Sequence, residues 1–443
     1  MPAETIAAVA TPPGRGGVGV VRVSGPKARE ILERLFLPAR PDFFGFTPRR
    51  MHLGSVRDRA GNVLDQVLAV LMPGPASLTG EDVAEIHGHG GPAVLASVLD
   101  EALALGARLA RPGEFTLRAF LAGKLDLTQA EAVAELVNAP CKAAASLALA
   151  SLSGLLGERV RGLRARLEEL RAQLCLAVDF PEDELDCPPP ERIAGAARGV
   201  IADIEALLNA AGRARVVREG ALLALVGPVN AGKSSLMNAL LGRTRALVAA
   251  TPCTTRDFIE EPLVLDGLPV RLADTAGLRE TEDEVERAGL ALSRDLAAEA
   301  DLVLFVADGA RPPDPADSEA ALACGPSRVL ALSNKRDLPW PAPSAFDAFA
   351  AQGLEVLAVS AKTGEGLDAL CRRVRERLLA GAGEPDPEAA APNARQARSL
   401  TLARDELSGL VADAEAGLPH DILSVRLDAA CRELAGITGE IAP

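Results

Sequence analysis

A glycine-rich segment in the second half of the chain has the residue types that bind phosphate. Residues 227–234 read Gly-Pro-Val-Asn-Ala-Gly-Lys-Ser, which fits the phosphate-loop pattern of Gly, four residues of any type, then Gly-Lys-Ser or Gly-Lys-Thr. Backbone amides of such a loop cradle phosphates, Lys233 reaches the β- and γ-oxygens, and Ser234 is a ligand for Mg²⁺. The alternative is an ordinary glycine-rich turn.

Three further segments define which nucleotide this loop would hold. Asp274 begins Asp-Thr-Ala-Gly, where its carboxylate can hold Mg²⁺ through water and the Gly277 amide can meet a γ-phosphate. Asp337 ends Asn-Lys-Arg-Asp, and a carboxylate there can accept hydrogen bonds from N1 and N2 of guanine, a donor pair that adenine lacks. Ser-Ala-Lys at 360–362 follows the last strand-like run. The sequence therefore predicts GTP as the nucleotide.

The Thr-rich segment at 249–257 is the candidate first switch, and Thr255 the second hydroxyl ligand of Mg²⁺. An ordinary Thr-rich loop is the alternative. Leu278 follows Gly277 where Ras-type enzymes have the Gln that orients water, so another group must activate the water. The predicted GTP-binding residues are Asn230, Ala231, Gly232, Lys233, Ser234, Ser235, Ala249, Ala250, Thr251, Pro252, Cys253, Thr254, Thr255, Asp274, Thr275, Ala276, Gly277, Asn334, Lys335, Asp337, Ser360, Ala361 and Lys362.

Strand-like runs alternate with helix-like segments around these motifs. The runs are 222–226, 262–265, 270–273, 302–307, 329–332 and 356–359. Asp266-Gly267 leaves no room for a crossover helix, so the second and third runs should form an antiparallel hairpin on an otherwise parallel sheet. The motifs then lie at strand ends along one edge of the sheet, where ligands bind in α/β folds.

The rest of the chain has two other patterns. Short apolar runs and Gly/Pro turns predict a small α/β domain over 1–120, with a helix at 93–105. Apolar residues at three- and four-residue spacing predict a helical domain whose halves, 121–215 and 381–443 including a linker, flank a GTPase domain at 216–380. The fold class is therefore multidomain α/β and all-α, with a discontinuous helical domain.

Composition narrows the functional class. The net charge of −14 argues against nucleic-acid binding by bulk electrostatics, so any RNA contact must be local or shared. Seven Cys at irregular spacing indicate reduced thiols and a cytoplasmic location. No uncharged run reaches the ~20 residues needed to span a bilayer, so we expect no membrane insertion.

Several motifs resemble those of the tRNA modification GTPase MnmE (TrmE) family over nearly the whole chain. They are Thr-Pro-Pro-Gly-Arg-Gly-Gly at 11–17, Thr-Gly-Glu-Asp at 79–82, the Gly/His string at 87–91, Arg-Pro-Gly-Glu-Phe at 111–115, Gly-Lys-Leu-Asp at 123–126 and Phe-Pro-Glu-Asp at 180–183. The resemblance implies an N-terminal domain that binds a (6S)-tetrahydrofolate derivative and dimerises, a helical domain, and an inserted Ras-like P-loop GTPase domain that dimerises in the presence of K⁺.

The resemblance also implies roles for single residues. Folate contacts fall on Arg22, Glu85 and Lys124, whose charges suit a pterin and a glutamyl tail; exposed ion pairs are the alternative. K⁺ would be held by Asn230, Ala249, Thr251 and Thr254, and the water-orienting glutamate is Glu286. For His87 and His89 we expect a turn motif with close backbone approach in preference to a metal site.

The implied function is a GTP-hydrolysing enzyme that, as a homodimer with the flavoprotein MnmG in a heterotetramer, adds a carboxymethylaminomethyl or aminomethyl group at C5 of the wobble uridine of certain tRNAs. The family has a terminal Cys-x-Gly-Lys motif, which the sequence as printed does not contain. A GTP-dependent switch or assembly factor without modification chemistry therefore stays open. Cys431 is expected to be a core thiol and no substitute for the terminal Cys.

Overall fold

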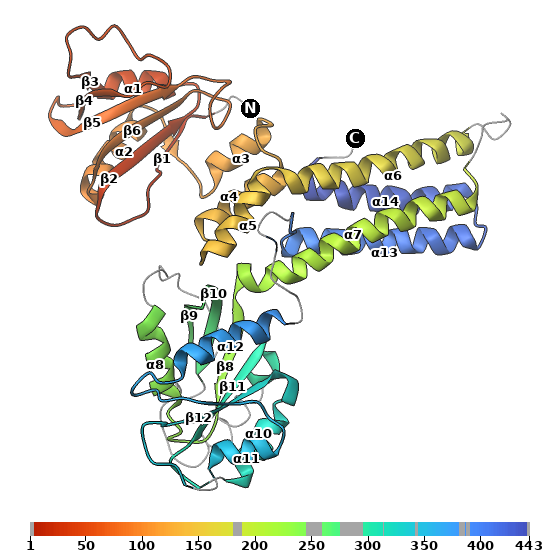
Figure 1. Ribbon diagram of the computed structural model, residues 1–443. Coiled ribbons are helices and arrows are strands. Elements are labelled where there is room, and N and C mark those ends of the chain that lie inside the picture. The colour runs from red at the N-terminus through yellow and green to blue at the C-terminus, as the bar shows by residue number, and fades with distance from the viewer. Residues whose placement is uncertain are drawn as a thin grey trace, which may run out of the picture. The chain divides into compact units, whose positions relative to one another are not determined.

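The computed structural model describes residues 4–179, 188–244, 259–274, 296–312, 314–341, 344–380, 386 and 390–440 (Figure 1). The chain separates into two compact units, Met1–Val133 and Ala134–Pro443. The expected domain boundary at residue 120 falls in the last turn of α3 (Glu114–Leu121), and that at 215 falls inside α7 (Pro190–Glu219). The finer domain boundaries stay predictions.

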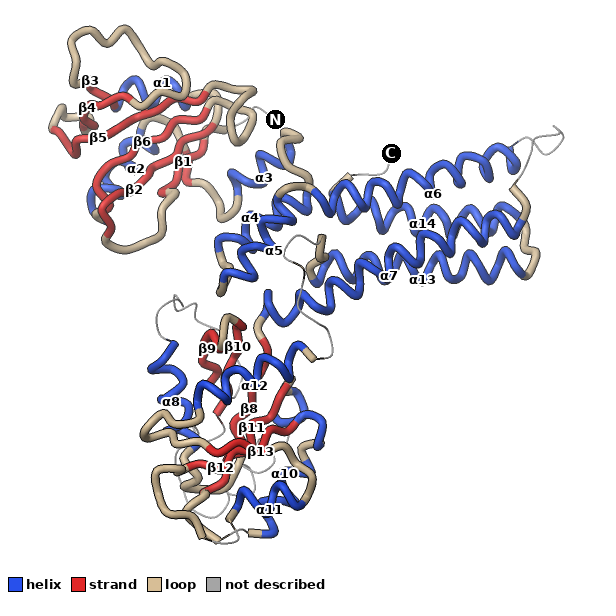
Figure 2. Tube along the Cα trace, in the orientation of Figure 1, coloured by secondary structure: helices blue, strands red, loops and turns tan. Residues whose placement is uncertain are grey.

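The first unit contains one sheet with helices packed on one of its faces (Figure 2). Its elements are β1 (Ile6–Val9), β2 (Gly16–Ser24), α1 (Ala28–Leu35), β3 (Phe36–Pro38), β4 (His52–Arg57), β5 (Val63–Met72), β6 (Val83–Gly90), α2 (Pro92–Ala104), β7 (Arg108–Leu109) and α3. The strand order is β3-β4-β5-β6-β2-β1-β7, antiparallel except where β7 joins β1. The predicted helix at 93–105 is confirmed as α2.

Side-chain alternation along the strands divides this sheet into a core face and an open face. Val21, Val23 and Ile86 are buried in the core with residues of α1 and α2. Arg22 lies between Val21 and Val23, and Glu85 between the buried Ala84 and Ile86, so both point to the other face, directly opposite each other in the β2/β6 register. The pleat thus places the two predicted folate residues side by side.

In the second unit, four helices from both sides of the predicted insertion form a bundle. They are α6 (Leu155–Asp179), α7, α13 (Ala394–Glu415) and α14 (His420–Thr438); α4 (Leu127–Val137) and α5 (Lys142–Leu152) precede them. Helix α13 packs against α7 and α14, and α14 packs against α6, so segments far apart in sequence lie side by side (Figure 1). The buried leucines of α6 recur at the predicted three- and four-residue spacing, at positions 163, 167, 170 and 174.

The remaining elements are the six strands of a second sheet and the helices between them, within the described residues. They are β8 (Ala221–Val226), α8 (Lys233–Thr244), β9 (Ile259–Leu265), β10 (Leu268–Asp274), β11 (Leu302–Asp308), α10 (Pro315–Ala323), η2 (Pro326–Arg328), β12 (Val329–Asn334), α11 (Ala345–Ala351), β13 (Val356–Ala358) and α12 (Leu367–Leu379). The order is β13-β12-β11-β8-β10-β9, and β9 alone is antiparallel to its neighbour. Asp266 and Gly267 both have positive φ, 47° and 79°, as a two-residue hairpin turn requires. The predicted hairpin is therefore confirmed.

One arginine joins the segments that enter and leave this sheet region. Arg218, in the last turn of α7, donates hydrogen bonds to the carbonyl oxygens of Ala391 and Pro392, each at 2.7 Å. Its Nε lies 3.2 Å from Glu135 of α4, and its side chain is 11% exposed. The chain therefore leaves the bundle and returns to it at one point.

Two surface properties bear on the predictions. No helix in the described part of the chain is long and apolar enough to cross a membrane. The arginine-rich stretch of α6 is charge-compensated, because Arg164, Arg166 and Arg171 each lie in an ion pair with an acidic residue.

Candidate functional site

The phosphate loop begins where β8 ends, and its glycines are required by close packing. Gly227 has φ 143°, and a Cβ there would overlap the carbonyl oxygen of Val306 on β11. Gly232 has φ 95°, and a Cβ there would overlap the side-chain amide of Asn334. Positive φ and missing space both exclude larger residues. The loop thus lies against the ends of neighbouring strands.

The side chain of the loop lysine is held by backbone carbonyl groups of the same loop. Lys233 begins α8 and its Nζ donates hydrogen bonds to the carbonyl oxygens of Gly227 and Pro228, at 2.8 and 2.9 Å. Ser234 and Ser235 follow in the first turn of the same helix. A helix N-terminus with an adjacent ammonium group favours a bound anion. These residues therefore have the chemistry of a phosphate site.

Asn334 connects the phosphate loop to the predicted base-reading segments. It is 2% exposed at the end of β12, its Nδ2 donates to the carbonyl oxygen of Ala231 at 2.9 Å, and its Oδ1 accepts from the amide of Ala361 at 3.1 Å. The structure thereby brings together three predicted segments that are separated by up to 130 residues in sequence.

The carboxylate predicted to bind guanine, that of Asp337, lies beside the Ser-Ala-Lys segment. Ser360 donates its hydroxyl to Oδ1 of Asp337 at 2.6 Å, and this hydrogen bond is the main reason why the pKa of Asp337 is lowered from its usual value. Asp337 is exposed to solvent at the surface of the domain. It is therefore an ionised acceptor, as recognition of the N1 and N2 donors of guanine requires.

Asp308 and Trp340 contact the predicted residue Lys335, and neither of them was identified from the sequence. Lys335 has φ 66° and its Nζ lies 2.6 Å from Oδ2 of Asp308, the last residue of β11. Trp340 donates its indole N–H to the carbonyl oxygen of Lys335 at 3.2 Å, and the Arg336 guanidinium lies 5.0 Å from the Trp340 ring centroid. The strand-end position of Asp308 was the available signal, because neighbouring strands end at the same edge.

Several predicted residues fall outside the described part of the chain. Asp274 ends β10 and its backbone pairs with Leu225 of β8, which places it at the same sheet edge. Residues 249–255, 275–277 and Glu286 lie outside the described residues. The predicted contacts of the first switch, the K⁺ backbone ligands and the water-orienting carboxylate stay predictions.

In the first unit, the predicted folate residues Arg22 and Glu85 are in direct contact. Arg22 donates through Nε to Oε1 of Glu85 at 2.7 Å, and His87 Nε2 lies 3.0 Å from Oε2 of the same carboxylate. The Arg22 guanidinium lies 5.5 Å from the ring centroid of Phe115. Two side chains, Arg22 and His87, thus contact one partly buried carboxylate on the open face of the sheet, and Phe115 lies beside Arg22.

Lys124 follows α3 and approaches the loop that contains the Thr-Gly-Glu-Asp motif. Gly80 has φ 77°, and a Cβ there would lie 3.0 Å from the Cβ of Ala122 and 3.8 Å from Cε of Lys124. The glycine therefore permits close approach of the loop to the turn that carries Lys124.

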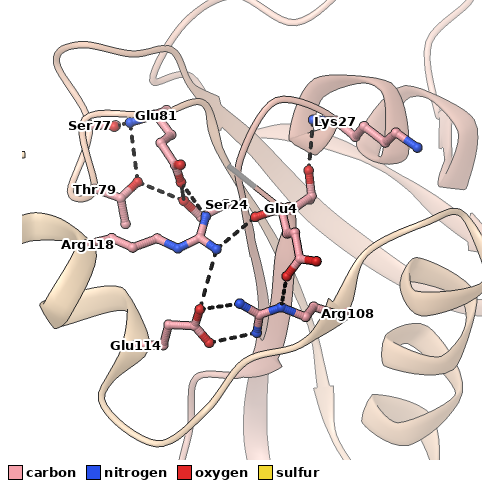
Figure 3. A network of polar contacts seen from close by, with 10 residues as sticks. Glu4, Ser24, Lys27, Ser77, Thr79, Glu81, Arg108, Glu114 and Arg118 are labelled. Atoms are coloured by element: carbon pink, nitrogen blue, oxygen red, sulfur yellow. Dashed lines mark hydrogen bonds and ion pairs between the residues drawn. The ribbon is translucent and has the colours of Figure 1, made fainter. Parts of the chain in front are cut away.

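A charged network holds this loop, the end of β2 and α3 together (Figure 3). Glu81 accepts from Ser24 Oγ at 2.9 Å and from Arg118 Nη1 at 2.8 Å through the same oxygen. Ser24 and Thr79 share a hydrogen bond of 2.7 Å between their hydroxyls. Glu114 receives two hydrogen bonds from the Arg108 guanidinium. Residues of two motifs that had no evident mutual relation in the sequence therefore support one assembly.

The two histidines of the Gly/His string are on a strand, so the expected turn motif is wrong. His87 and His89 belong to β6, two residues apart, and each is paired with a carboxylate: His89 Nδ1 lies 2.7 Å from Oδ1 of Asp65. The expected close approach is present, because a Cβ at Gly90 would lie 2.6 Å from the carbonyl oxygen of Gly16. The described residues contain no group of three or more His, Cys, Asp or Glu that could hold a metal.

Cys431 is confirmed as a core thiol. It is 3% exposed in the core of the bundle, and burial raises the pKa of its thiol to about 12. At pH 8 only about one such thiol in ten thousand is ionised. We expect iodoacetamide at pH 8 to modify the exposed Cys175 long before Cys431, as measured by peptide mass spectrometry. Equal labelling rates in the folded protein would contradict this assignment, and unfolding in urea should equalise them.

Comparisons with known proteins match the chain along nearly its whole length. The model of the "GTP-binding protein TrmE N-terminus" matches residues 5–124, and that of the "MnmE helical domain" matches residues 127–443. The tRNA modification GTPase MnmE of Nitratidesulfovibrio vulgaris strain DP4 is 51% identical over 99% of this chain and 96% of its own length. The protein of the same name from Lawsonia intracellularis is 42% identical over 98% and 95%. A crystal structure of the G domain of the T. maritima FeoB iron transporter is 26% identical over 35% of this chain and 98% of that chain, with a TM-score of 0.25.

Proposed function

The chain belongs to the MnmE family of tRNA modification GTPases, and we propose on this premise that it hydrolyses GTP to drive the modification of C5 of the wobble uridine in certain tRNAs. The product would be a carboxymethylaminomethyl or aminomethyl group, formed together with the flavoprotein MnmG. The observation that carries the GTP assignment is Asn334, which hydrogen-bonds the phosphate loop and the Ser-Ala-Lys segment at once.

The described residues account for how GTP would be bound. Asp337 would accept hydrogen bonds from the guanine N1 and N2 donors, while Lys233 would exchange the carbonyl oxygens of its own loop for phosphate oxygens. Ser234 lies in the first turn of α8 and would ligate Mg²⁺ together with Thr255. The close packing of Gly227 against Val306 and of Gly232 against Asn334 supports a phosphate loop that is preorganised for the triphosphate.

We propose that K⁺ stabilises the charge on the phosphates during hydrolysis and that one glutamate orients the attacking water. Asn230 has φ 64° and an exposed side chain, so its amide oxygen is available to a cation together with backbone oxygens of Ala249, Thr251 and Thr254. A cation there would offset the charge that develops between the β- and γ-phosphates. Glu286 would orient the attacking water, since Leu278 cannot.

We propose that the first unit binds a tetrahydrofolate derivative at Arg22, Glu85 and Lys124. Glu85 is a carboxylate for the paired donors of a pterin, whereas Arg22 and Lys124 are cations for a carboxylate-bearing tail. Folate would bring the one-carbon unit for the new substituent. Phe115 offers an aromatic face beside Arg22, which helps to orient a planar ligand.

We propose that the protein works in the cytoplasm as a homodimer that joins MnmG in a heterotetramer and receives tRNA. GTP hydrolysis would open and close paired GTPase domains, and this motion would rearrange the folate site. The test is complementation of a strain that lacks the gene, with wobble uridines measured by mass spectrometry of tRNA digests. Normal modification in the deletion strain would refute the modification role without affecting the GTPase assignment.

Replacing Glu286 by Gln should lower GTP turnover by about a hundredfold, because a neutral amide can orient the attacking water but lacks the carboxylate charge that polarises it. Affinity for a non-hydrolysable GTP analogue should be retained. Steady-state turnover in KCl and in NaCl, with fluorescent-analogue binding alongside, measures both quantities. Glu284→Gln is the matched control, as it changes a carboxylate two residues away. Equal turnover of the two variants would refute the proposed role.

A further inference from the structure

The loop between β3 and β4 exposes a phenylalanine completely. In residues 39–51 the side chain of Phe44 is 101% exposed, more than any other large apolar side chain among the described residues. Full exposure of a Phe forgoes about 1.5–3 kcal/mol that burial would contribute. Aromatic residues make up only 3% of the chain. The exposure of this side chain therefore indicates a role in binding another molecule.

The exposure of Phe44 does not reflect a poorly packed loop. Its neighbours Phe43 and Phe46 form an aromatic cluster with Phe36 and His52, with ring centroids 5.1–5.8 Å apart. The backbone is tied to the sheet, because the amide of Arg49 donates to the carbonyl oxygen of Leu71 at 2.8 Å. Phe44 is thus presented by a scaffold that holds the residues on either side of it.

The loop is also basic in an acidic protein. Residues 39–51 contain Arg40, Arg49 and Arg50 against a single Asp42, a net charge of +2 in a chain whose net charge is −14. The Arg40 and Arg50 side chains are exposed and make no ion pair or hydrogen bond within the described residues. The Arg49 guanidinium donates to the carbonyl oxygen of Ala76, a neutral acceptor that leaves its charge uncompensated.

We propose that loop 39–51 binds a single-stranded stretch of the tRNA, with the ring of Phe44 stacked on an unpaired base and Arg40 and Arg50 beside its phosphates. An anchored aromatic ring next to free cations is the combination used to bind single-stranded nucleic acid. Contact of this loop with the same loop in a second copy would bring like charges together, which disfavours self-association there. The inference rests on the proposed function, because the proposed function names tRNA as the substrate.

The proposal is tested by binding of fluorescein-labelled tRNA transcript and of a short labelled oligouridine to the full-length protein. Phe44→Ala should weaken both affinities by about five- to a hundredfold, while Phe44→Trp preserves them, because a base stacks on any aromatic face. Arg40→Gln with Arg50→Gln should weaken binding and reduce the steepness of its salt dependence. GTP hydrolysis should be unchanged in all of these variants.

The control is Leu109→Ala, which removes an exposed apolar side chain, 58% exposed, from the same unit. If Phe44→Ala binds tRNA like the wild type, the inference is wrong, and a simultaneous shift from dimer to monomer by light scattering would assign the loop to a protein contact. If wild-type protein binds no tRNA under any condition, the proposed function fails instead. Circular dichroism of each variant excludes loss of folding as the cause.

Discussion

Asp337→Asn is expected to reverse the base preference of the nucleotide site. The amide can no longer accept both guanine donors, so GTP affinity should fall by about a hundredfold or more. Xanthine carries an oxygen where guanine carries the N2 amine, and the new amide can donate to it. Xanthosine triphosphate should therefore become the preferred nucleotide. Competition binding against a fluorescent GTP analogue, with both triphosphates as competitors, measures the change.

Asp347→Asn is the matched control for that experiment. Asp347 is an exposed carboxylate of the same domain and accepts hydrogen bonds from Ser344 at the start of α11, away from the base-reading segments. Its replacement should leave the preference for GTP intact. Retention of GTP selectivity in Asp337→Asn would show that the base is read elsewhere.

Arg118→Ala is expected to destabilise the first unit strongly and to weaken folate binding. Arg118 is 14% exposed and lies between Glu81 and Glu114, so its loss leaves two partly buried carboxylates with less compensation. Breaking a fully buried charged contact costs about 3–5 kcal/mol, and the cost here should be smaller because both carboxylates are partly exposed and keep other donors. Because α3 leads to Lys124, the turn carrying that cation would also lose its support. Hydrogen exchange in residues 5–124 measures the stability, and calorimetry with 5-formyltetrahydrofolate measures the binding.

Two comparisons show whether this effect comes from the network. Arg34→Ala removes an exposed arginine paired with Glu30 at the next helical turn, and should cost only a few tenths of a kcal/mol.

Glu114 has a pKa lowered to about 2, chiefly by its hydrogen bonds from Arg108. Its contribution to stability is therefore complete above pH ~4.5 and is lost as the pH falls toward 2. Glu114→Gln should remove that part of the pH dependence, and an unchanged profile would assign it to other groups.

The nucleotide-binding region was predictable in detail because its signals are local. Each expected strand of the second sheet is present within a few residues, since a buried parallel strand is a continuous apolar run bounded by motif residues. The turn at Asp266 was predictable for the same reason, as only a two-residue hairpin fits between the flanking runs.

The first unit was less predictable because its important relations are tertiary. The short strands β3 and β7 have too few residues to show a period, and α3 begins inside a stretch identified only as a motif. The contact of Glu81 with Arg118 joins residues 37 positions apart, and nothing in either neighbourhood specifies the partner. The exposure of Phe44 was likewise invisible, since a Phe in an apolar cluster reads as core.

The hydrogen bonds of Arg218 show that the nucleotide-binding region begins and ends at neighbouring points. Because one guanidinium bonds the carbonyl oxygens of Ala391 and Pro392 from the last turn of α7, the chain ends that border the nucleotide-binding region are neighbours in space. The bundle can therefore be completed without that region by a short peptide bridge. The nucleotide-binding region could therefore be exchanged between relatives, or removed, at the point where Arg218 holds the two flanking segments together.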